Sequence, residues 1–320
     1  MIKQIDCLGV QKIRGVEVAI IDKIISQYGG DGFEKAISVM GRETVSHYAD
    51  RVYNAYCDEF KDADYLKNIE WLLRQYQASK KILLSAMFFT QAEELINNKM
   101  QNLSFYALYY ALFNALAANI ILHPHIHIDK TKKISHAQVF DDIDNYFVRF
   151  SIFSDPRIVD LLNDLRLMRE LYSYHLPLSG SLDVDDDRLN IDKLFSRLQS
   201  SLPVVLQVAN LLSFSSYFAW EKKIGKAIDE YSTHRNTVDD MFFSYIEVWD
   251  HLKTQPVMDG GDYSQQGYML AKIGIPWPIS WFLSEKMCEE LECGWGDGED
   301  SLPHEYDIAS VSRYLTDVMG

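Results

Sequence analysis

An uncharged run of 20 residues, 103–122, constrains the fold of this 320-residue chain more than any other feature. It reads LSFYALYYALFNALAANIIL and is long enough to cross a lipid bilayer as one helix. Its interior holds Ser104, Asn114, Asn119 and three tyrosines, and polar groups of this kind lack hydrogen-bond partners in lipid. The run therefore predicts the buried central helix of a helical bundle rather than a membrane span.

This predicted helix has two unlike sides. Small residues recur at spacings of four, four and three, at Ala107, Ala111, Ala115 and Ala118. Such a stripe lets another helix approach closely, either within the core of one chain or between two copies in a dimer. The opposite side is aromatic, with Tyr106, Tyr109, Tyr110 and Phe113.

Apolar residues at helical spacing extend over most of the chain. They predict helices over residues 16–28, 33–56 and 63–97, and then over 135–150, 155–175 and 190–223. Ser135 and Asp155 stand at N-cap positions, and Pro156 takes the first helical position after Asp155. Pro203 is expected to begin or kink a helix. Because alternating strand patterns are absent over most of the chain, the predicted fold class is an all-α bundle.

Composition divides the chain into three parts. Residues 1–60 are predicted to form an N-terminal helical extension, residues 61–225 a helical bundle, and residues 226–320 a loop-rich, acidic region that contains Trp and Gly. The net charge is −15, of which residues 281–320 carry −8. Overall charge therefore excludes nucleic-acid binding through bulk electrostatics. The acidic segment is either a solvated surface or a phosphate mimic that folds over a basic site.

The cysteines indicate a reducing compartment. Cys7, Cys57, Cys288 and Cys293 are scattered and form no CxxC pair, so neither a disulfide framework nor a zinc ribbon is predicted. The first residues contain no apolar core of signal-peptide length. We therefore expect a cytoplasmic protein.

A histidine-rich loop follows the central run. His123, His125, His127 and Asp129 alternate, and in an extended segment all four side chains would project from one side. Imidazoles and a carboxylate suit zinc, iron or nickel, whereas the alternative is a polar loop with incidental histidines. A third interpretation places His127 or His136 near a functional cleft without a metal.

Other motifs for metals and cofactors fail. Asp183, Asp185 and Asp187 begin like a calcium-binding loop, but Arg188 and Leu194 stand where glycine and glutamate are required. The chain also lacks GxxxxGK[ST], GxSxG, HExxH and a GxGxxG that follows a strand. We expect neither a bound metal nor an organic cofactor.

The segment RELYSYH, from Arg169 to His175, carries the strongest functional signal. Arginine grips a phosphate with two hydrogen bonds, and histidine exchanges protons near neutral pH, which together suit RNA cleavage without a metal. Six positions along a regular helix leave the two side chains about 120° apart. The site therefore requires a distorted helix end, which Pro177 favours, or a second copy of the chain. Alternatively, Arg169 pairs with Asp164 or Glu170 in an ordinary helix end.

The order of these pieces resembles the HEPN superfamily over roughly residues 62–223. The pieces are the aromatic and alanine-rich helix, a basic loop, the segment KKISHAQVFDDIDNYFV and the helix that ends in RELYSYH. The resemblance implies a HEPN-like bundle and a metal-independent endoribonuclease whose two subunits form one composite cleft. Arg169 and His175 match the catalytic pair. Glu170 stands where the family usually has a small polar residue or histidine, and is expected to orient Arg169 or His175.

The resemblance also implies partners. Arg166, Lys130, Lys132 and Lys133 would supply the positive potential that holds an RNA substrate. The chain would act as a homodimeric toxin or antiphage-defence effector, with an antitoxin or defence-system partner protein and no membrane. The competing hypothesis is a non-catalytic helical scaffold or sensor that binds a partner protein.

Overall fold

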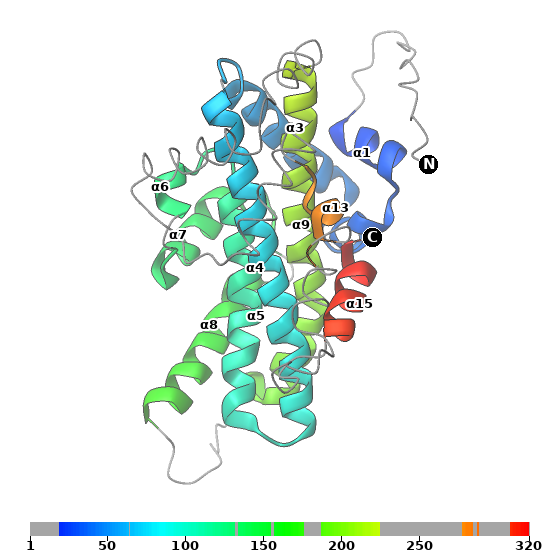
Figure 1. Cartoon of the computed structure of the whole chain (residues 1–320). Coiled ribbons are helices and arrows are strands. Elements are labelled where there is room, and N and C mark those ends of the chain that lie inside the picture. Colours follow the sequence, from blue (N-terminus) through cyan, green and yellow to red (C-terminus); the bar gives the residue numbers. More distant parts are fainter. Residues whose placement is uncertain are drawn as a thin grey trace, which may run out of the picture.

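The computed structural model describes residues 19–63, 65–131, 134–154, 157–175, 187–224, 277–283, 287 and 308–319. All regular elements in these ranges are helical, which confirms the all-α class. Shorter helices surround three long ones (Figure 1). The long helices are α4 (Tyr65–Asn97), α5 (Gln101–Leu122) and α9 (Ile191–Ile224).

Helix α5 forms the buried centre that its lack of charge predicts. The alanine stripe is covered by helices of the same chain, and each of its four members is at most 1% exposed. Ser85 of α4 donates to the carbonyl oxygen of Ala111 at 2.7 Å, a close approach that small side chains permit. The stripe therefore serves packing within one chain, and its assignment to a crossing between two copies is wrong.

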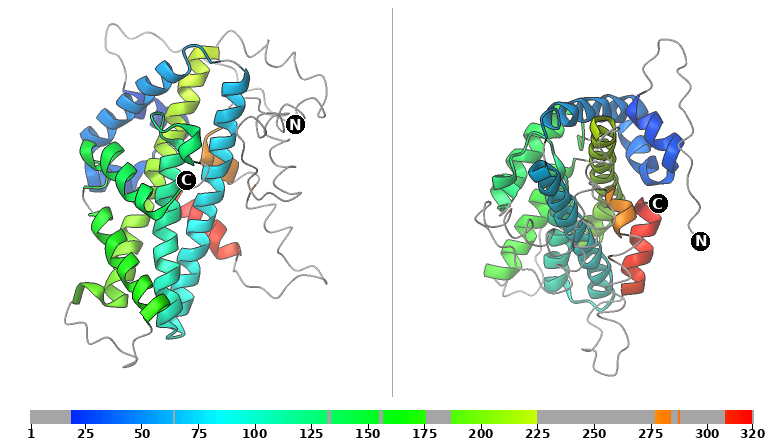
Figure 2. Two further views of the ribbon diagram at one scale, coloured as in Figure 1. Left: turned by 90° about the vertical axis from the view of Figure 1, so that its left-hand side faces the viewer. Right: turned by 45° about the horizontal axis from the view of Figure 1, so that its top comes forward.

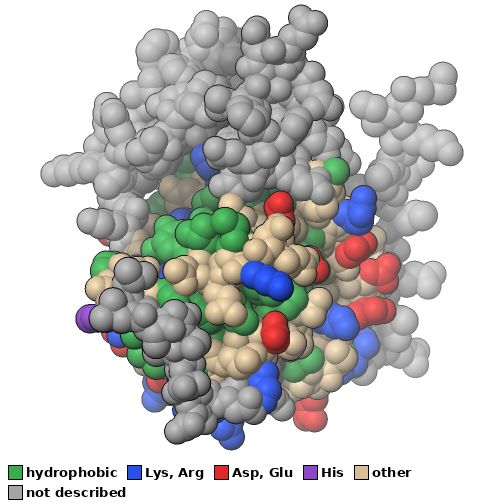
Figure 3. Space-filling model, turned by 90° about the horizontal axis from the view of Figure 1, so that it is seen from below, with side chains coloured by type: hydrophobic (Ala, Val, Ile, Leu, Met, Phe, Trp, Pro, Cys, Tyr) green, Lys and Arg blue, Asp and Glu red, His purple; other side chains and the backbone are tan. Residues whose placement is uncertain are grey.

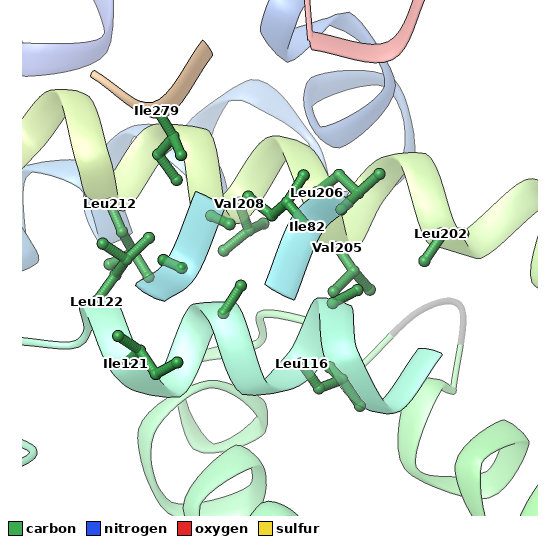
Figure 4. Close-up of a cluster of buried hydrophobic side chains, with 14 of the residues drawn as sticks. Ile82, Leu116, Ile121, Leu122, Leu202, Val205, Leu206, Val208, Leu212 and Ile279 are labelled. Carbon is green, nitrogen blue, oxygen red and sulfur yellow. The ribbon is translucent and has the colours of Figure 1, made fainter. Parts of the chain in front are cut away.

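Both α5 and α9 are long and apolar enough to cross a membrane by length and composition. However, 89% of the apolar window of α5 and 94% of that of α9 are buried inside the chain. Figure 4 shows why: side chains of the two helices interlock, and α4 and α13 (Ile279–Phe282) contribute to the same cluster. The cluster includes Leu116 and Leu122 of α5, Val205 and Leu212 of α9, Ile82 and Ile279.

Helix α9 runs without interruption through Pro203. The expectation that a new helix begins there is therefore wrong. Proline removes one backbone N–H donor from the helix. Leu202, Val204 and Val205 around it are fully buried, so their packing holds the helix in place despite the missing donor.

The helices between residues 20 and 59 pack against the upper part of the bundle (Figure 2). A single helix over 33–56 is not formed, because Gly41 has a φ of +84° and separates two helices. Glycine takes this conformation without the steric cost that other residues meet. The elements are α1 (Ile20–Tyr28), η1 (Asp31–Phe33), α2 (Glu34–Met40) and α3 (Arg42–Glu59).

A second group of helices covers the aromatic side of α5. Helices α7 and α8 both pack against α5 and against each other, which brings the histidine-rich loop and RELYSYH to one side of the molecule. The N-cap prediction for α7 is confirmed, since the Ser135 hydroxyl accepts from the Gln138 N–H at 3.2 Å. Asp155 and Pro156 lie outside the described residues. The elements are α6 (Ile128–Thr131), α7 (His136–Tyr146), η2 (Val148–Phe150), α8 (Ile158–Glu170), η3 (Leu171–His175) and η4 (Asp187–Leu189).

The last described helix, α15 (Ile308–Met319), packs against α4, α9 and η1. Gly32 makes this possible, because a Cβ atom there would lie 2.5 Å from the carbonyl oxygen of Met319. The buried amide of Gln207 adds polar ties: it donates to the Val318 carbonyl at 2.8 Å and accepts from the Ala36 N–H at 2.9 Å. Described parts of the N-terminal and C-terminal regions thus share the core of the bundle. The three-part division stays a prediction.

Candidate active site

Arg169 lies in the last turn of α8 and is buried, with 8% of the residue exposed. Its Nη1 donates to the Tyr110 hydroxyl at 3.4 Å, and its Nη2 donates to Glu170 Oε1 at 3.3 Å. The guanidinium carbon stands 4.8 Å from the centre of the Tyr109 ring, a favourable cation–π position. Arg169 therefore packs against the aromatic side of α5.

Glu170 joins two arginines. Its Oε1 accepts from Arg169 Nη2 at 3.3 Å and from Arg166 Nε at 3.1 Å. Of the two roles expected for Glu170, the structure supports the orientation of Arg169. Asp164, the other predicted partner of Arg169, instead accepts from Arg197 at 2.7 Å.

His136, the first residue of α7, joins this cluster. Its Nδ1 lies 2.5 Å from the Tyr109 hydroxyl oxygen, and its ring centre lies 4.8 Å from that of Phe113. From the sequence, His136 is considered only as an alternative to His127 near a functional cleft, and the spacing of the residues does not distinguish the two histidines. The tyrosine-rich side of α5 distinguishes them, because the Tyr109 hydroxyl is a partner of His136.

Burial and the nearby charges favour the neutral forms of His136 and Tyr109. Burial lowers the pKa of His136 below its usual value, and the nearby Arg169 and Arg166 lower it further against the opposing effect of Glu170. Burial raises the pKa of Tyr109 to about 12, although Arg169 acts in the opposite direction. At neutral pH, His136 and Tyr109 are therefore uncharged, and two arginines face one carboxylate, so the cluster has an excess of positive charge.

His175 occupies a different environment. Residues Leu171–His175 form a π-helical turn, so the predicted distortion of the helix end is confirmed. Tyr172 stacks on Phe105 of α5 with ring centres 5.0 Å apart, which holds the turn in place. His175 itself is exposed and has no hydrogen bond, ion pair or ring contact with any residue that the structure describes. Within one chain, Arg169 is buried and His175 is exposed, and no contact joins the two side chains among the described residues.

The other predicted RNA contacts are only partly assembled. Arg166 lies beside Arg169 through Glu170. Lys130 is exposed at the end of α6 and is linked to α7 by its carbonyl oxygen, which accepts from Gln138. Lys132 and Lys133 lie outside the described residues.

The histidine-rich loop does not present its side chains on one side. His123 is buried, whereas His125 and His127 are exposed, and Asp129 lies in helix α6 rather than in an extended segment. In the described ranges, no three His, Cys, Asp or Glu side chains gather as metal ligands. The alternating metal-binding arrangement is therefore wrong for this loop. Asp183 and Asp185 lie outside the described residues, and Asp187 begins η4.

His123 gives the fold a dependence on pH. Burial, and secondarily the positive charges around it, lowers its pKa from 6.5 to about 3. Below about pH 6.5 the unfolded chain therefore binds a proton that the folded chain excludes, so stability falls as the pH falls toward 3. Between pH 7 and pH 5, His123→Phe is expected to lose about 2 kcal/mol less free energy of unfolding than the wild type.

Denaturant titrations at the two pH values measure this difference. His127→Gln is the matched control, because His127 lies in the same loop but is exposed and is not among the groups that lower the pKa of His123. It should retain the pH dependence of the wild type. Equal losses for wild type and His123→Phe would show that the buried histidine does not govern the acid response.

Hydrophobic side chains gather at the end of the bundle where α5 begins and α8 with η3 ends. This surface, the apolar end, faces the viewer in Figure 3, with acidic and basic side chains near its edges. Its members are between 44% and 72% exposed, and His175 follows directly after one of them. They are Met100, Leu103, Tyr106, Leu167 and Tyr174.

No protein-family model, curated protein or solved structure matches the chain. The site itself combines an arginine pair, a bridging carboxylate, a tyrosine–histidine contact and a separate exposed histidine.

Proposed function

We propose that this chain is a metal-independent endoribonuclease that acts as a homodimeric toxin or antiphage-defence effector. His175 serves as the general acid–base, and Arg169 with Arg166 binds the scissile phosphate. One observation carries the proposal: a π-helical turn presents to solvent a histidine that has no partner among the described residues, at the end of the helix that holds both arginines. Turns of this kind are frequent at functional sites.

The reaction requires only these groups. An imidazole takes the proton from a ribose 2′-hydroxyl, the 2′-oxygen attacks the adjacent phosphorus, and the bond to the 5′-oxygen breaks. The leaving 5′-oxygen receives a proton from an imidazolium, and the products are a 2′,3′-cyclic phosphate and a 5′-hydroxyl. An arginine stabilises the charge that accumulates on the non-bridging oxygens.

A homodimer supports this chemistry better than one chain does. Within a chain, Arg169 is buried, His175 is exposed, and no contact between them is seen among the described residues. A second copy packed on the apolar end would cover exposed hydrophobic surface and bring its own π-helical turn close to the first. Exposed apolar patches rimmed by polar residues are typical of protein interfaces.

The alternative function is a non-catalytic scaffold or sensor that binds a partner protein. It is favoured by the state of Arg169, which is 8% exposed and already engaged by Tyr110 and Glu170. In that case the apolar end would contact a different protein, and the arginine cluster would hold α5, α7 and α8 together.

Incubation of the purified protein with end-labelled RNA in EDTA separates the two functions. A ribonuclease of the proposed type should cut RNA without added metal and leave 2′,3′-cyclic phosphate ends, while sedimentation shows a dimer. A folded dimer that leaves single-stranded and structured RNAs intact would favour the scaffold. Cleavage that EDTA abolishes would contradict the metal-independent mechanism.

A further inference from the structure

We infer that Glu170 is an internal ligand of an anion site formed by Arg166 and Arg169, and that a phosphate group of the RNA backbone displaces its carboxylate. The RNA part of this inference rests on the proposed function, whereas the anion site rests on the geometry of the three side chains. Glu170 would then regulate access to the arginines rather than only orient one of them.

The first support is the way in which the carboxylate is held. Both arginines bind the same oxygen, Oε1 of Glu170, at 3.1 Å from Arg166 and 3.3 Å from Arg169. Hydrogen bonds between arginine and a carboxylate are usually about 2.7–2.9 Å long, so this bridge is loose. The side chain of Glu170 is 38% exposed, which leaves it a path into solvent.

The second support is an unsatisfied donor. Arg169 Nε is buried and has no hydrogen-bond partner in the described part of the chain, and its side chain is 9% exposed. The neighbouring bond from Arg169 Nη1 to the Tyr110 hydroxyl is long, at 3.4 Å. Buried donors in folded proteins almost always have a partner, so this one points to a ligand that offers further oxygens.

Charge and shape select phosphate as that ligand. The cluster holds two guanidinium groups against one carboxylate, and its positive charge is increased when Glu170 moves out. A phosphodiester restores the balance and presents two non-bridging oxygens that match the fork of arginine. Tyr109 beneath Arg169 and Phe140 beneath Arg166 keep both guanidinium groups oriented while the anion exchanges.

The test measures binding separately from cleavage. A 2′-O-methyl RNA, which cannot be cut by attack of its 2′-oxygen, is titrated into full-length wild type, Glu170→Gln and Asp160→Asn, and inorganic phosphate is titrated in parallel. Asp160 lies on the same helix and is exposed, 4.0 Å from Arg157, so its variant removes the same charge away from the arginine pair. Glu170→Gln is expected to bind the RNA about tenfold more tightly, and Asp160→Asn less than about twofold.

Arg166→Gln in the Glu170→Gln background should remove the gain. Circular dichroism verifies that each variant is folded. Equal affinities for Glu170→Gln and Asp160→Asn would overturn the inference even if wild type cuts RNA. Conversely, a selective gain for Glu170→Gln without cleavage by any variant would support the anion site and reject the ribonuclease. A gain for RNA without one for inorganic phosphate would support the site as selective for a polynucleotide.

Discussion

Replacement of His175 by glutamine should slow RNA cleavage by about 10²–10⁴-fold, the usual contribution of a general acid–base. Glutamine preserves a polar side chain but cannot exchange a proton near neutral pH. The unfolding midpoint should stay unchanged, because His175 is exposed and has no partner among the described residues. Cleavage rates on labelled RNA and thermal melts followed by circular dichroism measure the two properties independently.

His47→Gln provides the matched control. His47 is also an exposed histidine on a helix, with 79% of its side chain accessible, and it lies on α3, away from the arginine cluster. This variant should cut RNA at the wild-type rate. A His175→Gln protein that is as active as His47→Gln would remove His175 from the mechanism, and His136 would become the next histidine to replace.

The central part of the fold was predictable because its signals are local and strong. A helix of twenty residues without a charge is expected to lie in a protein core, and α5 is buried as expected. The Ser135 hydroxyl caps α7 by accepting from the backbone N–H three positions later, so the spacing in the sequence is enough to predict this interaction. The fold class follows from such periodic and capping patterns.

The two places where local rules failed have different physical causes. Pro203 would interrupt an isolated helix, but its buried neighbours hold α9 continuous. Conversely, apolar spacing over 33–56 predicted one helix, whereas Gly41 adopts a positive φ and divides the segment into two helices. Burial against other helices decides the first case, whereas a backbone conformation that glycine adopts at little cost decides the second.

The candidate site shows the same limit. The contact of Arg169 with Glu170 joins adjacent residues and was predictable from the sequence. The contact of His136 with Tyr109 joins α7 to α5, and it depends on the angle at which two helices cross. The burial of Arg169 depends on that packing as well. The sequence therefore predicted a phosphate-binding arginine but not its position over the Tyr109 ring.

Arg74→Ala is expected to lower the free energy of unfolding by about 3–5 kcal/mol, the range found when one partner of a buried ionic network is removed. Arg74 is 2% exposed. Its Nη1 donates to the carbonyl oxygens of Ile121 at 3.1 Å and Ile126 at 2.8 Å, and its Nε and Nη2 donate to Glu70 Oε1. Alanine would leave these acceptors without their donor and open a cavity beside Trp71.

Denaturant unfolding of Arg74→Ala, Arg74→Met and Arg42→Ala separates the causes. Methionine fills most of the volume but donates no hydrogen bond, so a loss close to that of alanine would assign the effect to the polar ties at the end of α5. Arg42 pairs with Asp22 at the surface, where both side chains are about half exposed, and its removal should cost less than about 1 kcal/mol. If Arg74→Ala costs no more than Arg42→Ala, the buried arginine does not hold the end of α5. The loop between α5 and α7 would then need another anchor, and the position of His136 beside Tyr109 would need another explanation.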